Sequence, residues 1–425
     1  MRSPIGIMIL VLGGWLFATS VVAGAGLRAG IAVRVVTPDP LLPLSGGVGA
    51  SEPADRKEGE LTVRALVVSD GTTTVALVST DFLGFPAVLG DRVRDQVREI
   101  PASNILIGAT HTHSAPDPYA FPDAQGKTSA DLAYLQSVVD RAAAAIREAL
   151  GRLEPVSIKV ATGEFKGRIA YNAYAEALFD PRGSVVQFVG ADGAVRATLV
   201  NYAVHPEVLG NRRGICSPDL VGPLYDRLSA RGGGTGIFFN GALGGMVTAD
   251  CRGPDGRDIG TWAEAVRIGE KLADEALRIV AGAPVQAEPE LRCRATTVRF
   301  PVESPVIRAV LNGSPMGYRT DPDGRVATQV NWIRLGTAQM LTVPGEALPN
   351  LGAYLKRKMG GENPMLLGLT NDAFGYILTR EDWGAFRRYD YISRTCLGER
   401  TAEIYTDAAL ALAAGKEGEP IREAR

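Results

Sequence analysis

Three histidines are the residues of this chain whose type and spacing best suit chemistry, because histidine occurs nowhere else in its 425 residues. His111 and His113 follow the apolar run 104–109, and His205 follows the apolar run 199–204. Side chains alternate faces along an extended segment, so we expect His111 and His113 to point to the same side. A single histidine at a strand end is more often structural. Three of them at strand ends favour a shared metal site or acid/base cluster, since sites in α/β folds commonly form where strands end.

A carboxylate could complete such a site. Catalytic zinc typically takes three protein ligands and keeps one position open, and two histidines with one carboxylate form a common set. Charge and periodicity cannot select one acid among the 47 that the chain contains. Glu346 is the best candidate because it ends the apolar sequence Leu-Thr-Val-Pro-Gly-Glu. The alternative is a glutamate in the first turn of a helix, stabilised by the helix dipole.

The segments that must position these residues have the pattern of an α/β fold. A helix over 86–99 precedes the run 104–109, which indicates a strand–helix–strand unit. Asp-Gly turns between β-rich runs indicate two hairpins, over 61–68 with 73–79 and over 184–189 with 195–204. Periodicity predicts further helices at 128–150, 219–230, 259–280, 346–358 and 399–412, and strands at 235–240 and within 286–343. The expected fold is one large α/β domain with mixed β-sheets and flanking helices.

The composition is that of a globular protein, with 46% hydrophobic and 22% charged residues and a formal net charge of -2. No basic excess is available to neutralise phosphates, so nucleic acid is not an expected partner. The chain contains neither G-x-S-x-G nor H-E-x-x-H, which disfavours the hydrolases that these motifs define. Lys127 and Thr128 resemble the end of a P-loop, but Phe121 stands where that motif requires glycine.

The N-terminus has the three-part pattern of a signal peptide. Arg2 precedes an uncharged run over 3–27, which is strongly apolar at first and then rich in small residues suited to cleavage. We therefore predict residues 1–25 as a signal peptide, or alternatively as an anchor helix, because the uncharged run is long enough to span a bilayer. The protein would then be exported, to the periplasm or outside the cell. Residues 415–425 are predicted as a charged tail.

Four cysteines occur, and none forms a C-x-x-C pair, which disfavours a cysteine zinc site. In an oxidising compartment they could form two disulfides. Cys216 and Cys251 flank one helix–strand unit and are the preferred pair. The alternative is four buried free thiols.

Five motifs in order connect the histidines and Glu346 to a known family. They are His-Thr-His-Ser-Ala-Pro at 111–116, Asn-Tyr-Ala-Val-His-Pro at 201–206, Phe-Asn-Gly-Ala-Leu-Gly at 239–244, Pro-Gly-Glu at 344–346 and Gly-Leu-Thr-Asn-Asp-Ala-Phe-Gly-Tyr-Ile at 368–377. Together they resemble the catalytic domain of the neutral, non-lysosomal ceramidases. The resemblance implies a ceramidase-like zinc hydrolase domain over 26–414, without the C-terminal β-sandwich found in that family.

The resemblance also implies the roles of individual residues. By motif position, the ligands of the Zn²⁺ ion are His111, His205, Glu346 and Tyr376. His113 lies beside the metal as an acid/base or oxyanion group. Positions on the substrate side are taken by Arg168, Tyr171, Asn240 and Val247, with Arg168 also implied in catalysis. Asp219 matches an aspartate whose role is structural.

One departure from the family concerns a serine at the reaction centre. Family ceramidases carry Gly-Asp-Val-Ser-Pro, and this chain has Gly-Gly-Met-Val-Thr from Gly244 to Thr248. Val247 occupies the serine position and Gly245 the aspartate position. A valine side chain can neither attack a carbonyl nor donate a hydrogen bond to it.

These observations predict an exported zinc-dependent hydrolase that cleaves the N-acyl amide bond of ceramide or a related lipid amide with metal-activated water. His113 would carry the proton to the leaving amine, and Arg168 would hold an oxygen or an anionic group of the substrate. One alternative is a related zinc hydrolase acting on another amide or an ester. The other is a non-catalytic homologue that binds metal or ligand. The expected partner is a small-molecule or lipid substrate, with contact to a membrane surface as a further expectation.

Overall fold

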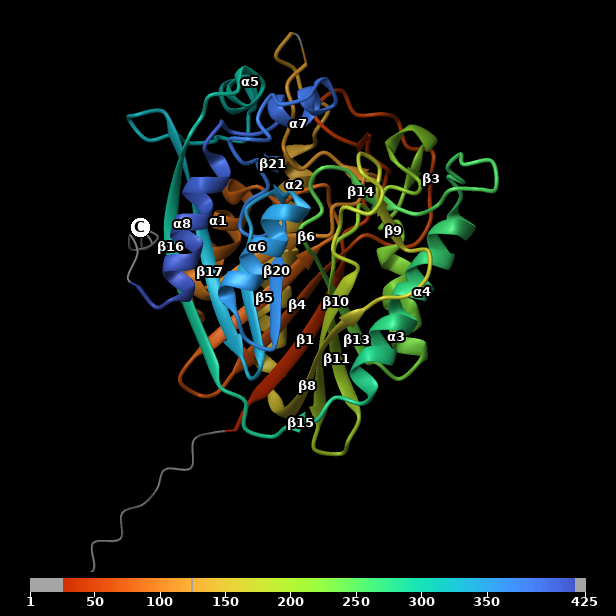
Figure 1. Cartoon of the computed structure of the whole chain (residues 1–425), viewed down its shortest axis with the longest axis vertical. Coiled ribbons are helices and arrows are strands. Elements are labelled where there is room, and N and C mark those ends of the chain that lie inside the picture. Colours follow the sequence, from red (N-terminus) through yellow and green to blue (C-terminus); the bar gives the residue numbers. More distant parts are fainter. Residues whose placement is uncertain (1–25, 124, 417–425) are drawn as a thin grey trace, which may run out of the picture.

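The computed structural model describes residues 26–123 and 125–416. Its largest sheet has the strand order β13-β11-β10-β8-β1-β4-β5-β6, with β15 beside β8 (Figure 1). The sheet is mixed, because β5 pairs with β6 and β11 with β13 in parallel while the other neighbours are antiparallel. The strands are β1 Arg28–Val35, β4 Thr62–Ser69, β5 Thr74–Thr80, β6 Ile105–Ala109, β8 Glu154–Glu164, β10 Arg182–Gly190, β11 Val195–Tyr202, β13 Thr235–Asn240 and β15 Val285–Gln286.

A second sheet has the order β16-β17-β18-β20, in which only β18 and β20 run parallel. Its strands are β16 Leu291–Pro301, β17 Arg325–Leu335, β18 Ala338–Thr342 and β20 Asn363–Leu367. Four short pairs join loops at one end of the sheets, namely β2 Leu44–Ser45 with β7 Ala115–Pro116, β3 Arg56–Lys57 with β12 Ile215–Cys216, β9 Ala170–Asn172 with β14 Val247–Ala249, and β19 Glu346–Ala347 with β21 Tyr376–Ile377.

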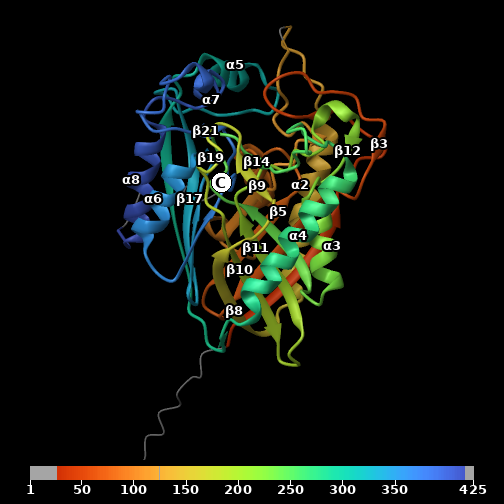
Figure 2. The ribbon, with the colours of Figure 1, turned by 45° about the vertical axis from the view of Figure 1, so that its right-hand side comes forward.

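The sheets pack face to face between two layers of helices, which Figure 2 shows from the side. Alternation along β4 explains the layers, because Val63 and Val67 pack with the helices while Leu66 and Val68 pack between the sheets. The large sheet is covered by α1 Ala87–Gln96, α2 Leu132–Gly151, α3 Val221–Ala230 and α4 Trp262–Ala281. The second sheet is covered by α6 Pro349–Met359 and α8 Thr401–Ala413.

The mixed α/β fold expected from the sequence is confirmed, including both hairpins and the unit β5–α1–β6. The helix predicted over 346–358 begins three residues late, at Pro349, where proline is suited to the first helical position. Glu346 therefore lies in the short strand β19 and not in a first helical turn. Two short helices were missed: α5 Pro305–Gly313, which begins with Ser304 as its cap, and α7 Asp390–Arg394.

The predicted disulfide between Cys216 and Cys251 is wrong, because all four cysteines are free. The physical reason is that Cys216 packs in the core beneath α1 and α2, whereas Cys251 packs in a separate core beneath α3 and α4. The predicted signal peptide and most of the charged tail, residues 417–425, lie outside the described residues. Within 26–123 and 125–416, no helix combines the length and the apolar character needed to cross a membrane.

Candidate metal centre

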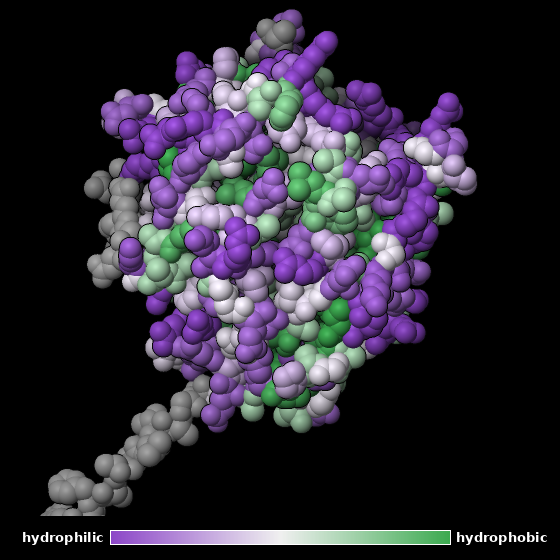
Figure 3. Space-filling model, viewed as in Figure 1, coloured by the Kyte–Doolittle hydropathy of each residue, from purple (hydrophilic) through white to green (hydrophobic). Residues whose placement is uncertain are grey.

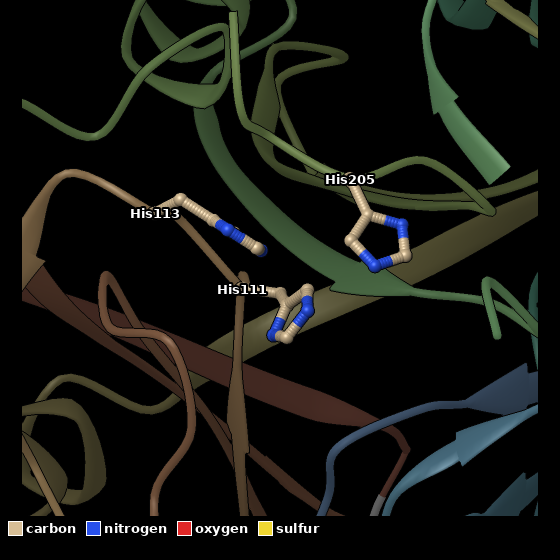
Figure 4. Close-up of side chains that lie close together, drawn as sticks. All are labelled: His111, His113 and His205. Atoms are coloured by element: carbon tan, nitrogen blue, oxygen red, sulfur yellow. The ribbon is translucent and has the colours of Figure 1, made fainter. Parts of the chain in front are cut away.

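The three histidines converge on one point at the end of the sheets, as Figure 4 shows. One ring nitrogen of each lies within 4.8 Å of one ring nitrogen of the other two. The ring centroids of His111 and His205 are 4.8 Å apart, and those of His111 and His113 are also 4.8 Å apart. His111 and His205 are buried. The shared site that the sequence favoured is therefore present in the geometry.

The convergence depends on a contact between the two edges of the large sheet. The strand order ends at β13 on one side and at β6 on the other, yet the ends of these strands meet. The hydroxyl of Ser79 on β5 donates to the carbonyl of Phe238 on β13 at 2.6 Å. The strands that precede His111 and His205 are β6 and β11, which pair with β5 and β13, so this contact brings their ends together.

Asn240, the last residue of β13, links the two histidine segments directly. Its amide nitrogen donates to the carbonyls of Thr110 (3.0 Å) and Val204 (2.7 Å), which immediately precede His111 and His205. Its amide oxygen accepts from the backbone N–H of Val204 at 3.0 Å. Asn240 is fully buried, so these hydrogen bonds have no competition from water. It acts here by positioning both histidines.

The proximity of His111 and His113 has a different cause from the one expected. Strand β6 ends at Ala109, and His111 has a φ of 73°, so the segment is not extended and alternation does not apply. The backbone N–H of His111 donates to the carbonyl of Phe82, and that of His113 donates to the carbonyl of Pro206. Loop hydrogen bonds therefore hold the pair, with the two rings meeting edge to face.

The orientation of His111 and His205 suits metal binding. Nδ1 of His111 donates to the carbonyl of Leu83 at 2.5 Å, and Nδ1 of His205 donates to the carbonyl of Val247 at 2.8 Å. Each hydrogen bond places the proton on Nδ1 and leaves the lone pair of Nε2 free, which is the usual arrangement of metal-ligating histidines.

Glu346 faces both of these Nε2 atoms. Its Oε1 lies 3.7 Å from Nε2 of His111, and its Oε2 lies 3.2 Å from Nε2 of His205. Oε2 of Glu346 and Nε2 of His113 are buried and have no hydrogen-bond partner. Buried polar atoms are normally paired, so these two atoms indicate a missing partner between the side chains. Two imidazoles and a carboxylate are a donor set that zinc accepts, and the site fits this ion.

Tyr376 is brought to the site by the pairing of β19 with β21, in which it is the direct partner of Glu346. Its hydroxyl lies 4.0 Å from the sulfur of Met246, and the residue is buried. Burial raises the pKa of Tyr376 well above its ordinary value, which keeps the phenol protonated in the metal-free chain. Tyr376 can therefore offer its phenol oxygen as a fourth ligand, next to Glu346.

Burial also sets the charge states of the histidines. It lowers the pKa of His111 and of His113 to about 3, so both rings are neutral at pH 7. Burial acts in the same direction on His205, but the Glu346 carboxylate outweighs it and raises the pKa of His205 to about 9. Burial favours the neutral form of Glu346, yet the neighbouring imidazoles prevail and lower its pKa. In the metal-free chain this balance favours a protonated His205 beside the Glu346 carboxylate, so the proton on Nε2 of His205 must leave before that nitrogen can bind a metal.

A cavity of about 1270 Å³ opens onto the site. His111, His113, Glu346 and Tyr376 border it. The rest of its wall is mixed. It includes the apolar or aromatic side chains of Leu83, Tyr119, Phe121, Ile307, Met316 and Phe374, and the charged side chains of Asp91, Arg92, Asp95, Arg319, Asp321 and Asp372. This volume is above the usual range for a small-molecule pocket. The candidate metal centre thus borders a large space whose wall offers apolar contacts as well as polar and charged ones.

The residues predicted on the substrate side lie elsewhere. Within the described part of the chain, Arg168, Tyr171, Asn240 and Val247 do not border this cavity. Arg168 is more than half exposed and pairs with Asp250 at 3.1 Å. The guanidinium of Arg252 lies over the ring of Tyr171 at 3.9 Å. Contact of Arg168 and Tyr171 with a substrate stays a prediction.

Val247 serves the site through its backbone. Its carbonyl accepts from both the backbone N–H (2.9 Å) and the Nδ1 (2.8 Å) of His205. Its side chain is fully buried in the core beneath α1 and α2. Asp219 has the structural role expected of it, since its carboxylate accepts from the backbone N–H groups of Leu209 and Leu220.

Sequence reasoning missed two neighbours of the histidines. Oε2 of Glu207 lies 3.7 Å from Nδ1 of His113, and Tyr391 on α7 borders the cavity with its ring against that of Tyr376. Glu207 follows His205 by two residues, which was an available signal. Tyr391 had none, because α7 was not recognised.

Solved structures with the same architecture decide the fold. The neutral ceramidase from Pseudomonas aeruginosa matches with a TM-score of 0.75 at 19% sequence identity, over 94% of this chain and 77% of that one. The fold is that of neutral ceramidase. A structure described as ceramidase complexed with C2 matches with the same TM-score and the same shares at 18% identity. No protein-family model and no curated protein matches the sequence.

Proposed function

We propose that this protein is a zinc-dependent hydrolase that cleaves the N-acyl amide bond of ceramide or a related lipid amide. The observation that supports it most is the convergence of His111, His205 and Glu346, with buried unpaired atoms at the cluster, beside a large cavity that His111 and Glu346 border. The neutral ceramidase fold supports the same reaction class by analogy.

The proposed zinc ligands are His111, His205, Glu346 and Tyr376. Zinc, when bound, supplies Lewis acidity that polarises an amide carbonyl and lowers the pKa of water to about 7. The protein contributes the fixed directions of the ligands, because carbonyl groups hold both imidazoles and the β19–β21 pair holds both oxygens. Such fixed geometry avoids reorganisation during the reaction.

His113 is the proposed proton carrier. Its neutral ring presents Nε2 to the cluster without a hydrogen-bond partner, so this nitrogen can accept a proton from the attacking water. The same proton is then given to the nitrogen of the amide as the carbon–nitrogen bond breaks, so that a neutral amine leaves. Glu207, beside Nδ1 of His113, favours the protonated ring between these two steps.

The fully buried Val247 supports alternatives, since no hydroxyl stands at the position of the family serine. A related zinc hydrolase of another amide or ester needs no such hydroxyl if water attacks directly. A non-catalytic homologue would retain the ligands and bind metal or ligand without turnover. These alternatives differ from the main proposal in measurable ways.

The test combines metal analysis with turnover. The purified protein is expected to contain about one zinc ion per chain, by analogy with other catalytic zinc sites. It is expected to release fatty acid from a short-chain fluorescent ceramide. Glu346→Gln serves as the inactive control. Zinc binding with cleavage of simple esters or acyl amino acids alone would favour the related hydrolase, and zinc binding with no cleavage of any of them would favour the non-catalytic homologue.

We also propose that the protein is exported, to the periplasm or outside the cell. The support is the charge and apolar pattern of residues 1–25. Determination of the N-terminal sequence of the mature protein tests this. A mature chain that starts after the small residues near position 25 indicates cleavage, and an intact N-terminus in the membrane fraction indicates an anchor.

A further inference from the structure

The segment 383–391 is unusually rich in aromatic residues. Four of its nine positions are Trp383, Phe386, Tyr389 and Tyr391, whereas aromatic residues make up 7% of the whole chain. The segment includes the short 3₁₀ helix Arg387–Tyr389 and the start of α7. In Figure 1, α7 lies at the end of the molecule where β21 is found, opposite the end that carries β15, and β21 includes Tyr376.

Phe386 is the most exposed large hydrophobic side chain in the described ranges, at 65%. Its ring meets Tyr389, and Tyr389 stacks on Tyr174, in each case with centroids 5.6 Å apart. These three rings, Phe386, Tyr389 and Tyr174, form an aromatic cluster. Tyr389 and Tyr174 support Phe386, whose side chain faces the solvent. A rigid exposed aromatic anchor is typical of contacts with another phase or partner.

The cluster continues to the mouth of the cavity. Tyr391 is 39% exposed and borders the cavity, and Val48 is also exposed and borders it. The loop that carries Val48 lies next to Tyr391 on α7, because a Cβ placed on Gly47 would lie 3.2 Å from the Tyr391 hydroxyl. An apolar molecule that left a lipid phase at this point would enter the space that leads to the histidines.

Cationic groups accompany the aromatic rings. Arg387 is exposed, and its side chain makes no hydrogen bond or ion pair within the part of the chain that the structure describes. Arg388 donates to the carbonyl of Tyr174 and lies over its ring. Asp390 is the acidic residue of this segment, and Glu381 and Asp382 immediately precede the segment. Figure 3 shows mainly hydrophilic side chains at this end of the molecule, with small hydrophobic areas between them.

We propose that the segment 383–391 docks on the surface of a phospholipid bilayer and so places the mouth of the cavity against the lipid. Tryptophan and tyrosine are enriched at the headgroup level of membranes, and arginine contacts lipid phosphates. Phe386 inserts below the headgroups, and Arg387 contacts a phosphate. This inference rests on the proposed function, because a lipid amide would be presented in such a surface.

Vesicles without any lipid amide test the docking separately from the reaction. The full chain is expected to sediment with vesicles of phosphatidylcholine, and more strongly when phosphatidylglycerol is added. The double variant F386A/R387Q is expected to bind about tenfold more weakly, since it loses an inserted ring and a cation. Val285→Ala, which truncates another exposed apolar side chain on β15 at the opposite end, is the matched control and is expected to bind like the wild type.

Zinc content and melting temperature establish that the variants are folded. Equal vesicle binding by wild type and F386A/R387Q would overturn the inference. It would also be overturned if light scattering showed a wild-type dimer that the double variant dissociates, because the segment would then contact a second copy. If the double variant loses vesicle binding but the wild type cleaves no lipid amide, the docking inference stands and only the proposed function is refuted.

Discussion

Glu346 and Tyr376 are direct partners in the parallel pair of β19 and β21. The backbone N–H of Glu346 donates to the carbonyl of Gly375 at 2.9 Å, which fixes the register of the pair. The preceding residue must be glycine, because a Cβ on Gly345 would lie 2.3 Å from the Gly375 carbonyl oxygen. A two-residue ladder therefore presents both proposed oxygen ligands to the two histidines.

Replacement of the carboxylate should abolish metal binding. Glu346→Gln is expected to weaken zinc affinity by more than ~100-fold, beyond the loss typical of outer-shell changes, because a ligand charge is removed. Elemental analysis and competition with a chromophoric chelator measure the loss. Glu275→Gln is the control, since Glu275 is a buried carboxylate that pairs with Arg278 on α4 away from the histidines. A zinc affinity in Glu346→Gln equal to that of the control would exclude Glu346 as a ligand.

Zinc affinity should rise with pH. The pKa of His205 is raised to about 9 in the metal-free chain, so at neutral pH zinc must displace a proton from this ring. We expect the affinity to increase about tenfold per pH unit between pH 6.5 and 9 and then to level off. Calorimetry in buffers of different ionisation enthalpy counts the released protons. A release of zero would contradict the His205–Glu346 ion pair, and a second proton would show that Tyr376 binds as a phenolate.

The pairing of His205 with Glu346 predicts that the metal-free and the zinc-loaded protein differ in how their stability depends on pH. The folded pKa of His205 lies above the ordinary value of 6.5, so its stabilising effect is complete below pH 6.5 and is lost as pH rises through 9. The melting temperature of the metal-free protein should therefore fall between pH 6.5 and 9. Over the same range, the difference in melting temperature between the zinc-loaded and the metal-free protein should grow. Melting curves with and without a chelator measure both. If the melting temperatures with and without chelator changed with pH in parallel, the raised pKa of His205 would be contradicted.

Asn240 should control zinc affinity by holding the two segments that carry His111 and His205. Asn240→Ala removes the hydrogen bonds to the carbonyls of Thr110 and Val204, and we expect a cost of about 3 kcal/mol in unfolding free energy and a 10–100-fold loss of zinc affinity. Asn331→Ala is the matched control, because Asn331 is also fully buried and its amide donates to the carbonyl of Ser103, which does not adjoin a histidine. It should destabilise the fold to a similar degree with less effect on zinc. Equal losses of zinc affinity in both variants would argue against a specific role of Asn240 in positioning the two histidines.

Restoring the family serine should not restore a reaction centre. Val247 is fully buried among apolar side chains, and Val247→Ser would place a hydroxyl there and remove two methyl groups. We expect a loss of about 2–4 kcal/mol in unfolding free energy and no gain in ceramide turnover. Val247→Ala separates the lost packing from the added hydroxyl. A higher turnover by Val247→Ser than by the wild type would show that the position does face the substrate.

Much of the fold could be predicted because its signals are local. Alternation of apolar residues and the turn at Asp70-Gly71 were sufficient for the β4–β5 hairpin, and helical periodicity was sufficient for α4. The start of α6 at Pro349 was missed because apolar periodicity continues through 346–348, and only the local backbone pairing of Glu346 ends it. Helix α7 was missed because five residues carry too little periodicity.

The sequence by itself was sufficient to identify the candidate metal-ligating residues. Scarce histidines after apolar strands, together with the Pro-Gly-Glu motif, were enough to single out the side chains that meet. Only the tertiary structure decided why they meet. The contact of β13 with β6, the left-handed backbone of His111 and the bonds of Asn240 join segments far apart in the chain. Local patterns report burial and hydrogen bonding along one segment, whereas the meeting of distant strand ends depends on how whole sheets twist and pack. The same reason separates Cys216 from Cys251 and turns Val247 into the core while its carbonyl holds His205.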